Sequence, residues 1–247
     1  MTEEPYRWIE AIANRREYIE NQLAAGSPIT AVSCAEGVLF VTVSRGQQKL
    51  FEIYDRIAMG GIGHPGDIER LRMSAIEVAS AEGFSRSVHD VSLRRMAAYS
   101  LSPVLKNAFE QIYGPPFLAR MLFAELGRKG EPDLLLQLDY DGSLHIHEAT
   151  AASCGFAVIS GKSHSSRMMS EYLREKKCAQ LTGNEALPIA LAAWTVGHMT
   201  LAQEEGALPS GEEIAAHQQE QLQGGTLEAV LLDRRATSHA TFRPLKR

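Results

Sequence analysis

The sequence is poor in the features that mark several whole classes of protein. Its 247 residues include only three cysteines, Cys34, Cys154 and Cys178, which are far apart and form no Cys-x-x-Cys pair. This usage argues against a disulfide scaffold and favours a reduced, cytoplasmic compartment. No stretch reaches the ~18 apolar residues of a membrane span. The charged segment 1–20 also lacks the apolar centre of a signal peptide, so neither a membrane anchor nor secretion is expected.

An excess of positive charge is also missing. The net charge is −5 and no basic run occurs, so we expect no nucleic-acid or membrane-surface partner. With 45% hydrophobic and 22% charged residues, the composition is that of an ordinary globular protein. The length supports a sizeable core without disulfides. No internal repeat divides the chain, and we predict a single domain over residues 1–247.

Hydrophobic periodicity and turn signals predict the order of the elements. The first is an amphipathic helix at 6–24. Nine strands are predicted, at 29–34, 38–44, 48–53, 57–63, 119–126, 133–139, 143–148, 155–161 and 227–233. Four further helices are predicted, at 67–81, 88–113, 163–177 and 185–202. We expect Gly83 to end the second helix, and Pro103 either to kink the third or to delay its start. The polar segment 203–225 is predicted to be a surface excursion with one or two helical turns.

This order predicts the fold class. The strands come in hairpins and not singly between helices, which argues against a doubly wound parallel sheet. Blocks of antiparallel strands alternating with paired helices favour an α+β, four-layer αββα sandwich. In it two antiparallel sheets are stacked between helix pairs, with an extra helix at the N-terminus.

Two clusters could in principle carry metal or thiol chemistry. His145 and His147 of "HIHE" share one face of a strand and could bind zinc, but no third ligand stands at a suitable spacing. An exposed hairpin face is the simpler interpretation, so no metal site is predicted. Cys154 could pair with His164 or His198 as a nucleophile. Its small-residue surroundings favour a buried side chain instead.

A nucleotide cofactor is not expected either. The glycines at 60, 61, 63 and 66 lie in no GxGxxG or Gly-Lys-Ser/Thr motif, and no helix opens at the required place. No other cofactor is indicated by the sequence.

Longer stretches resemble a known family. The segment "GVLFVTVSRGQQKLFEIYDRIAMGGIG", residues 37–63, resembles the alpha subunits of actinobacterial-type proteasomes, which have the N-terminal nucleophile hydrolase fold. Three later segments are similar to later parts of the same alpha subunits. They are 67–97, 139–161, which contains the "YDGS" hairpin, and 227–233, "LEAVLLD". The resemblance covers roughly residues 8–205 and 226–245, and is most specific over 37–95.

The resemblance implies a subunit without its own catalysis. Beta subunits of the family are proteases that use an N-terminal threonine, an aspartate and a lysine. Ser27 falls at the threonine, Val43 at the aspartate and Lys49 at the lysine. Because the carboxylate is missing and Pro28 follows Ser27, a helix-to-strand turn is favoured over a nucleophile. The alternative is a self-compartmentalising hydrolase that needs no beta partner, with Ser27 exposed by processing. An orphan ring protein stays open as a third possibility.

The resemblance also implies partners. Alpha subunits form rings of seven that cap beta rings, so a homo-oligomeric ring, beta subunits and unfolded or tagged protein substrates are expected. The first helix would contact the ring neighbour through Trp8, Ile12, Ile19 and Leu23. The N-terminal tail, residues 1–5, would gate the pore, and the expected gate residues are Thr2, Glu3, Glu4, Pro5 and Tyr6. The archaeal tail motif "YDR" is absent here, and "PYRW" stands in its place.

At the strand hairpin, Lys49 would meet the C-terminal carboxylate of a ring-shaped ATPase or another activator. Gly60 and Gly61 would let the activator's tail lie close to the backbone.

Overall fold

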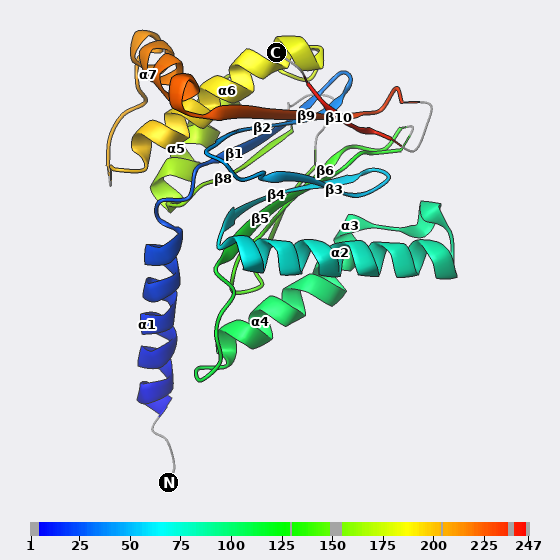
Figure 1. Ribbon diagram of the computed structural model, residues 1–247, viewed down its shortest axis with the longest axis vertical. Helices are drawn as coiled ribbons and strands as arrows, with labels where there is room; N and C mark the ends of the chain where they lie inside the picture. The colour runs from blue at the N-terminus through cyan, green and yellow to red at the C-terminus, as the bar shows by residue number, and fades with distance from the viewer. Residues whose placement is uncertain (1–4, 129, 149–154, 204, 237–239, 246–247) are drawn as a thin grey trace.

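The computed structural model describes residues 5–128, 130–148, 155–203, 205–236 and 240–245. Two five-stranded antiparallel sheets are stacked face to face (Figure 1). The first sheet has the order β10-β9-β2-β1-β8. Its strands are β1 (Ile29–Cys34), β2 (Gly37–Ser44), β8 (Phe156–Ile159), β9 (Thr226–Asp233) and β10 (Phe242–Pro244). The second has the order β3-β4-β5-β6-β7. Its strands are β3 (Leu50–Tyr54), β4 (Ile57–Gly63), β5 (Ala119–Glu125), β6 (Leu134–Leu138) and β7 (Leu144–Glu148).

Helices cover the outer face of each sheet. Over the second sheet lie α2 (Pro65–Ser85), α3 (Leu93–Met96) and α4 (Ser102–Glu110), and over the first lie α5 (Ser163–Arg174) and α6 (Gly183–Thr200). Helix α7 (Gly211–Gly224) packs against α6, and α1 (Pro5–Leu23) projects from one end. No described helix is long and apolar enough to cross a membrane.

Three hydrophobic core layers hold these elements together. One lies between the two sheets, and one lies under each helix layer. Strands β1 and β2 are buried at every position, including the polar Thr30, Ser33, Thr42 and Ser44. The predicted four-layer αββα sandwich is therefore confirmed.

Several predicted element boundaries are wrong. Helix α2 runs through Gly83 and ends two residues later, at Ser85. Gly83 is retained inside the helix because an added Cβ would lie 2.1 Å from the Tyr54 hydroxyl. The next helix starts at Leu93, ahead of Pro103, so its start is not delayed. A π-helical turn over residues 97–101 precedes the proline, which stands in the first turn of α4.

The excursion at 203–225 holds more helix than predicted. Helix α7 has 14 residues, against the one or two turns expected. A capping box starts it, in which Ser210 accepts from the Glu213 backbone N–H while the Glu213 carboxylate accepts from the Ser210 N–H. This Ser-x-x-Glu pattern is a helix-start signal. The short strand β10 was not predicted.

Helix α1 is fixed to the rest of the chain by its second half. The Arg15 guanidinium donates to the carbonyls of Ala108 and Gly114, both at 2.8 Å, at the end of α4. Carbonyls at a helix end lack partners within the helix, so this contact satisfies them. Ile19 and Leu23 are fully buried in the same region. Both were predicted to contact a ring neighbour, and this is corrected here because the chain's own core occupies them.

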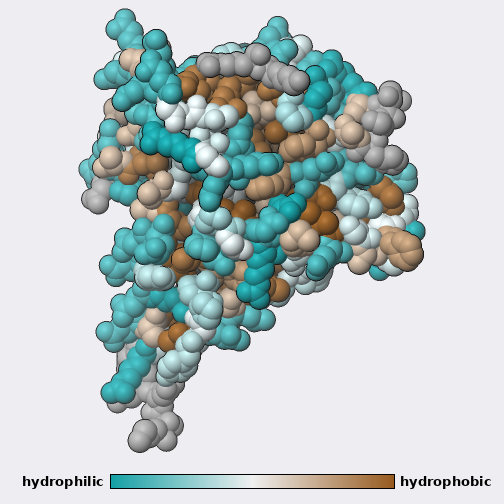
Figure 2. Space-filling model, in the orientation of Figure 1, coloured by the Kyte–Doolittle hydropathy of each residue, from teal (hydrophilic) through white to brown (hydrophobic). Residues whose placement is uncertain are grey.

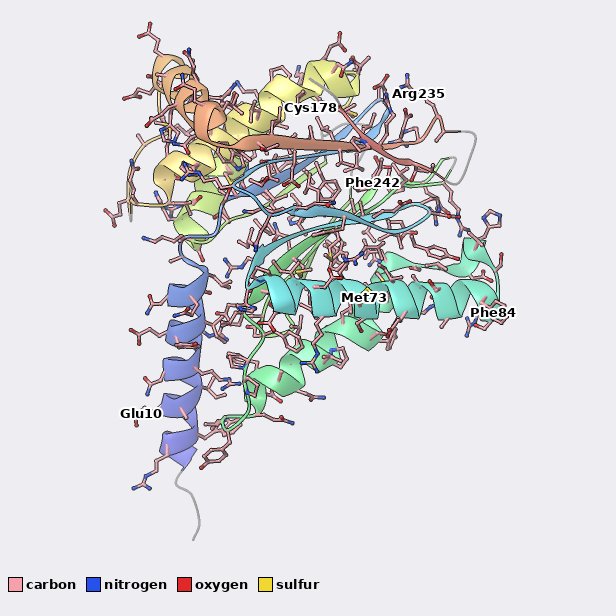
Figure 3. The ribbon with its side chains drawn as sticks, in the orientation of Figure 1. Glu10, Met73, Phe84, Cys178, Arg235 and Phe242 are labelled. Carbon is pink, nitrogen blue, oxygen red and sulfur yellow. The ribbon has the colours of Figure 1, made fainter. Side chains whose placement is uncertain are left out.

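The first half of α1 leaves apolar side chains uncovered. Trp8 is 48% and Ile9 64% exposed, while Ile12 is partly buried. Glu10 points away from the molecule on the outer side of the helix (Figure 3). Most of the surface in this region is hydrophilic, with scattered hydrophobic side chains (Figure 2). The apolar surface that α1 offers a partner is therefore centred on its N-terminal turns, with Tyr18, 51% exposed, farther along the helix.

A buried ion cluster joins α1 to the second sheet. Arg120, only 7% exposed, donates to Asp139 at 3.1 Å, to Glu20 of α1 at 3.1 Å and to the Ser160 carbonyl at 2.8 Å. The Tyr140 hydroxyl donates to the same Glu20 carboxylate at 2.8 Å. Burial works against the charged guanidinium, but Asp139 and Glu20 outweigh it and raise the pKa of Arg120. Every charge in this cluster has a partner.

Candidate functional site

A cavity of about 670 Å³ opens where α1 ends, at the edge of both sheets. Segments far apart in the sequence form its walls. They are the end of α1, the turn at 25–27, Val43 of β2, the loop at 45–48, strands β3 and β4, the start of α2, helix α6 and one residue of α7.

Lys49 enters this cavity from the residue before β3. Its ammonium donates to the Ser27 carbonyl at 3.3 Å and forms no ion pair with any residue that the structure describes. The nearby Glu228 carboxylate is already used, because one of its oxygens accepts from the backbone N–H groups of Lys49, at 2.9 Å, and of Leu50, at 3.3 Å. The ammonium can donate three hydrogen bonds and makes one.

This environment makes the Lys49 amine less basic than that of an exposed lysine. Burial lowers the pKa of Lys49 to about 8, and the Glu228 charge offsets only part of that effect. Desolvation penalises a cation unless an anion compensates it. A carboxylate entering the cavity would supply that compensation.

Other charged and titratable groups line the same cavity. Arg45 donates to the neutral Gln221 side chain of α7 at 2.8 Å, so this contact leaves its charge uncompensated. His198 of α6 lies 2.9 Å from a ring nitrogen of His217. Burial, then His217 and the cations Arg45 and Lys49, lower the pKa of His198 to about 4. The start of α2 also lines the cavity, but its first backbone N–H groups already bond to His64, and the Glu69 carboxylate on this wall is paired with Arg72 at 2.7 Å. Lys49 and Arg45 therefore offer the positive charge that an anion entering the cavity would meet.

The three positions aligned with a protease site do come together. The Ser27 hydroxyl donates to the Val43 carbonyl at 3.0 Å and accepts from the Trp194 indole at 3.3 Å, and the Ser27 carbonyl accepts from Lys49. Ser27 stands inside the chain, after α1 and before Pro28. Its α-nitrogen is therefore an amide and not the free amine that an N-terminal nucleophile uses as its base.

The two predicted docking glycines have different places. Gly61 lines the cavity, donates to the Lys49 carbonyl at 3.2 Å and lies so close to α2 that a Cβ would come within 2.9 Å of Ile68. Gly60 faces the space between the sheets, where a Cβ would meet Ile29 at 3.0 Å. Its predicted role beside a docked tail is therefore corrected to a packing role. Gly63 lines the cavity instead, with φ at +123°.

Sequence reasoning missed the far wall of the cavity, although it considered His198 as a partner of Cys154. Arg45, Trp194, His198 and Gln221 all line it, and three of them come from the C-terminal third of the chain. No local motif marks them as a site. The helix that carries Trp194 and His198 was predicted at 185–202, and the Ser-x-x-Glu start of α7 could have indicated the helix that carries Gln221.

The remaining candidates lie elsewhere. His145 and His147 are exposed on β7, and the described residues hold no cluster of three or more metal-ligating side chains. The proposed thiol pair rests on Cys154, which lies outside the described residues. So do Thr2, Glu3 and Glu4 of the predicted gate, whereas Pro5 and Tyr6 belong to helix α1 and not to a tail.

Fold and site together define a class: an αββα sandwich in which the position of an N-terminal nucleophile is held inside the chain behind a helix. A family model described as "Proteasome subunit" matches residues 24–197, and the chain belongs to this family.

Named relatives place it on the alpha side of the family. A protein named "Proteasome subunit alpha" from Kineococcus radiotolerans is 31% identical over 245 residues, covering 96% of this chain and 90% of that protein. Proteins of the same name from Nocardioides sp. and Xylanimonas cellulosilytica are 27% and 29% identical. They cover 96% of this chain, and 83% and 88% of their own lengths. The chain is an alpha-type proteasome subunit.

Proposed function

We propose that the chain forms the outer ring of a bacterial proteasome core particle, where it admits substrates and docks activators without catalysing peptide hydrolysis. The observation that carries this proposal is the Lys49 cavity, in which a half-buried ammonium has no anionic partner among the residues that the structure describes. The resemblance to the family puts the catalytic centre of its beta subunits at this same place.

The absence of catalysis is supported by Ser27. Its hydroxyl is engaged by Val43 and Trp194, its α-nitrogen is in a peptide bond, and position 43 has no carboxylate. The pure chain should not cleave fluorogenic peptides, and its mass should show an N-terminus ahead of α1. A mature chain that starts at Ser27, with turnover abolished by Ser27→Ala, would contradict this part.

Ring formation is supported by α1. Its N-terminal turns expose Trp8 and Ile9, and the Arg15 contacts hold the helix in place before any neighbour arrives. Exposed apolar side chains gathered in one place mark interfaces. Trp8→Ser with Ile9→Ser should shift the protein from rings of about seven copies to small oligomers in sedimentation velocity. Ile19→Ser is no substitute, because it would damage the core.

Gating is proposed for the N-terminal residues 1–5, which precede or begin α1. Removal of these residues should raise degradation of an unfolded protein by the ring assembled with beta subunits, while the sedimentation of the ring stays the same. Unchanged degradation would mean that another segment closes the pore.

Activator docking is proposed for Lys49, with Gly61 and Gly63 as the close wall. A C-terminal carboxylate would pair with the ammonium, and a hydrogen bond between charged groups contributes roughly 1.5–3 kcal/mol. Because several tails engage one ring together, the loss of each pairing is multiplied.

The test compares two lysines in particles assembled with the beta subunit. Lys49→Met should abolish stimulation by a ring-shaped ATPase, while basal peptide cleavage and ring assembly stay unchanged. Lys106→Met is the matched control, since Lys106 is exposed on α4 and faces only Glu110, at 3.8 Å. Equal stimulation of both variants would exclude the docking role.

A further inference from the structure

The Lys49 amine has the geometry of a nucleophile as well as that of a cation. Its single hydrogen bond goes to the Ser27 carbonyl, which one N–H satisfies. After loss of a proton that bond can remain, and the lone pair is left for another direction. The amine stands in a cavity of about 670 Å³, which leaves room for a small reagent.

We propose that Lys49 is an acylation site whose donor is an acyl phosphate. The neutral amine attacks the acyl carbon, and the carbon–oxygen bond to phosphate breaks. Phosphate leaves with the bonding electron pair, and the nitrogen releases a proton to solvent. The products are an N-acyl-lysine and inorganic phosphate, and no further co-reactant is required.

The walls of the cavity favour this class of donor. An acyl phosphate carries its negative charge on the leaving group, and the cavity presents the Arg45 cation to an anion. The Glu69 carboxylate also lines the cavity, but it is paired with Arg72 at 2.7 Å. Arg45 is exposed at the rim and contacts the neutral Gln221, so it can meet the phosphate while the acyl carbon faces Lys49.

The protonation equilibrium adds to the geometry. With a pKa of about 8, about a quarter of Lys49 is neutral at pH 7.5, against about one part in a thousand for a lysine at ~10.4. A less basic amine is also intrinsically less nucleophilic, which offsets part of this gain. We expect about tenfold faster acylation than at an exposed lysine.

The consequence for docking rests on the proposed function. An acyl group removes the charge and the proton donors with which Lys49 would meet a tail carboxylate, so acylated rings would be insensitive to activators. The acylation itself is measured without any activator, and the two ideas can therefore fail separately.

The experiment treats the purified full-length chain with limiting acetyl phosphate, and in parallel with limiting acetic anhydride, from pH 6.5 to 9.5. Peptide mapping with a protease that does not cut at lysine gives the acetylated fraction at Lys49 and, as the reference, at Lys106. Arg45→Gln is treated in the same way. This variant leaves both Gln221 and Lys49 unchanged.

Both reagents should acetylate Lys49 about tenfold faster than Lys106 at pH 7.5, with the Lys49 rate levelling off above about pH 8. Arg45→Gln should slow the acetylation of Lys49 by acetyl phosphate at least about twofold more than it slows acetylation by the uncharged anhydride. Equal labelling of Lys49 and Lys106 by both reagents would overturn the proposal. A preference with the anhydride alone would overturn the assignment of acyl phosphates as donors.

Discussion

Two cations near the end of α1 have opposite surroundings. Arg120 is buried among Asp139, Glu20 and a carbonyl, and these partners raise its pKa. Lys49 has one carbonyl, and its pKa falls to about 8. Burial opposes charge at both sites, and only the number of anionic partners differs. The chain itself supplies the anionic partners of Arg120, whereas Lys49 is free to receive an anionic ligand.

The largest expected effect is at Arg120. Arg120→Met would leave the Asp139 and Glu20 carboxylates, whose side chains are 27% and 36% exposed, without their cation. Loss of one partner of a fully buried pair typically costs about 3–5 kcal/mol, and the remaining solvent contact of these carboxylates places the expected cost at about 3 kcal/mol. The free energy of unfolding, measured by urea denaturation, should fall by that amount, against about 0.3–0.5 kcal/mol for Lys106→Met at an exposed helix pair. A loss of less than about 1 kcal/mol would mean that the Arg120 cluster is not a structural anchor.

Arg15 extends the comparison to a cation bound only by carbonyls. Arg15→Met removes contacts from α1 to the end of α4, and hydrogen bonds made by charged groups are worth about 1.5–3 kcal/mol. Unfolding should become easier by about 2 kcal/mol, and proteolysis within α1 should become faster. Arg7→Met, earlier in the same helix, serves as the control, because Arg7 is exposed. Similar proteolysis of the two variants would show that Arg15 does not hold the helix.

The histidine pair tests the wall of the Lys49 cavity. His198 has a pKa of about 4 in the folded chain and ~6.5 when unfolded, so between these values the unfolded state binds more protons. The stability that neutral His198 contributes is complete above pH 6.5 and is lost as the pH falls through 4. His198→Gln should show a shallower decline of unfolding free energy from pH 6.5 to 4.5. If the unfolding free energies of wild type and His198→Gln declined in parallel, His198 would not titrate in this way.

The smallest effect is expected at Lys49 itself. Lys49→Met should change the unfolding free energy at pH 7 by less than about 1 kcal/mol, or increase it, because no anion loses a partner. The folded chain releases the Lys49 proton near pH 8 and the unfolded chain near 10.4. Wild type should therefore gain stability relative to the variant as the pH rises from 8 to 10. A loss of several kcal/mol at pH 7 would reveal a structural ion pair.

The same contrast explains what the sequence could predict. Hairpin signals and apolar periodicity are local, and they predicted the sandwich and nearly every strand. The "QKLFEIYDR" segment drew attention to Lys49 because its charge opens a strand. The partners of Arg120 and the Trp194–His198 wall come together only through packing between distant elements, which no local pattern encodes. Consecutive strand residues face opposite sides of a sheet, so only one of Gly60 and Gly61 could line the cavity. The sequence does not show which side of the strand faces the cavity, so it could not tell which glycine that is.

Lys49 has no anionic partner among the residues that the structure describes, and its titration is the sharpest test of that arrangement. Lysine labelled with ¹³C at the ε-carbon can be followed by NMR from pH 6 to 11, with Lys49→Arg used to assign the signal. The midpoint for Lys49 should lie near 8, and addition of a carboxylate-terminated peptide should move it upward. A midpoint at or above ~10.4 in the free chain would show instead that the ammonium is already solvated or paired.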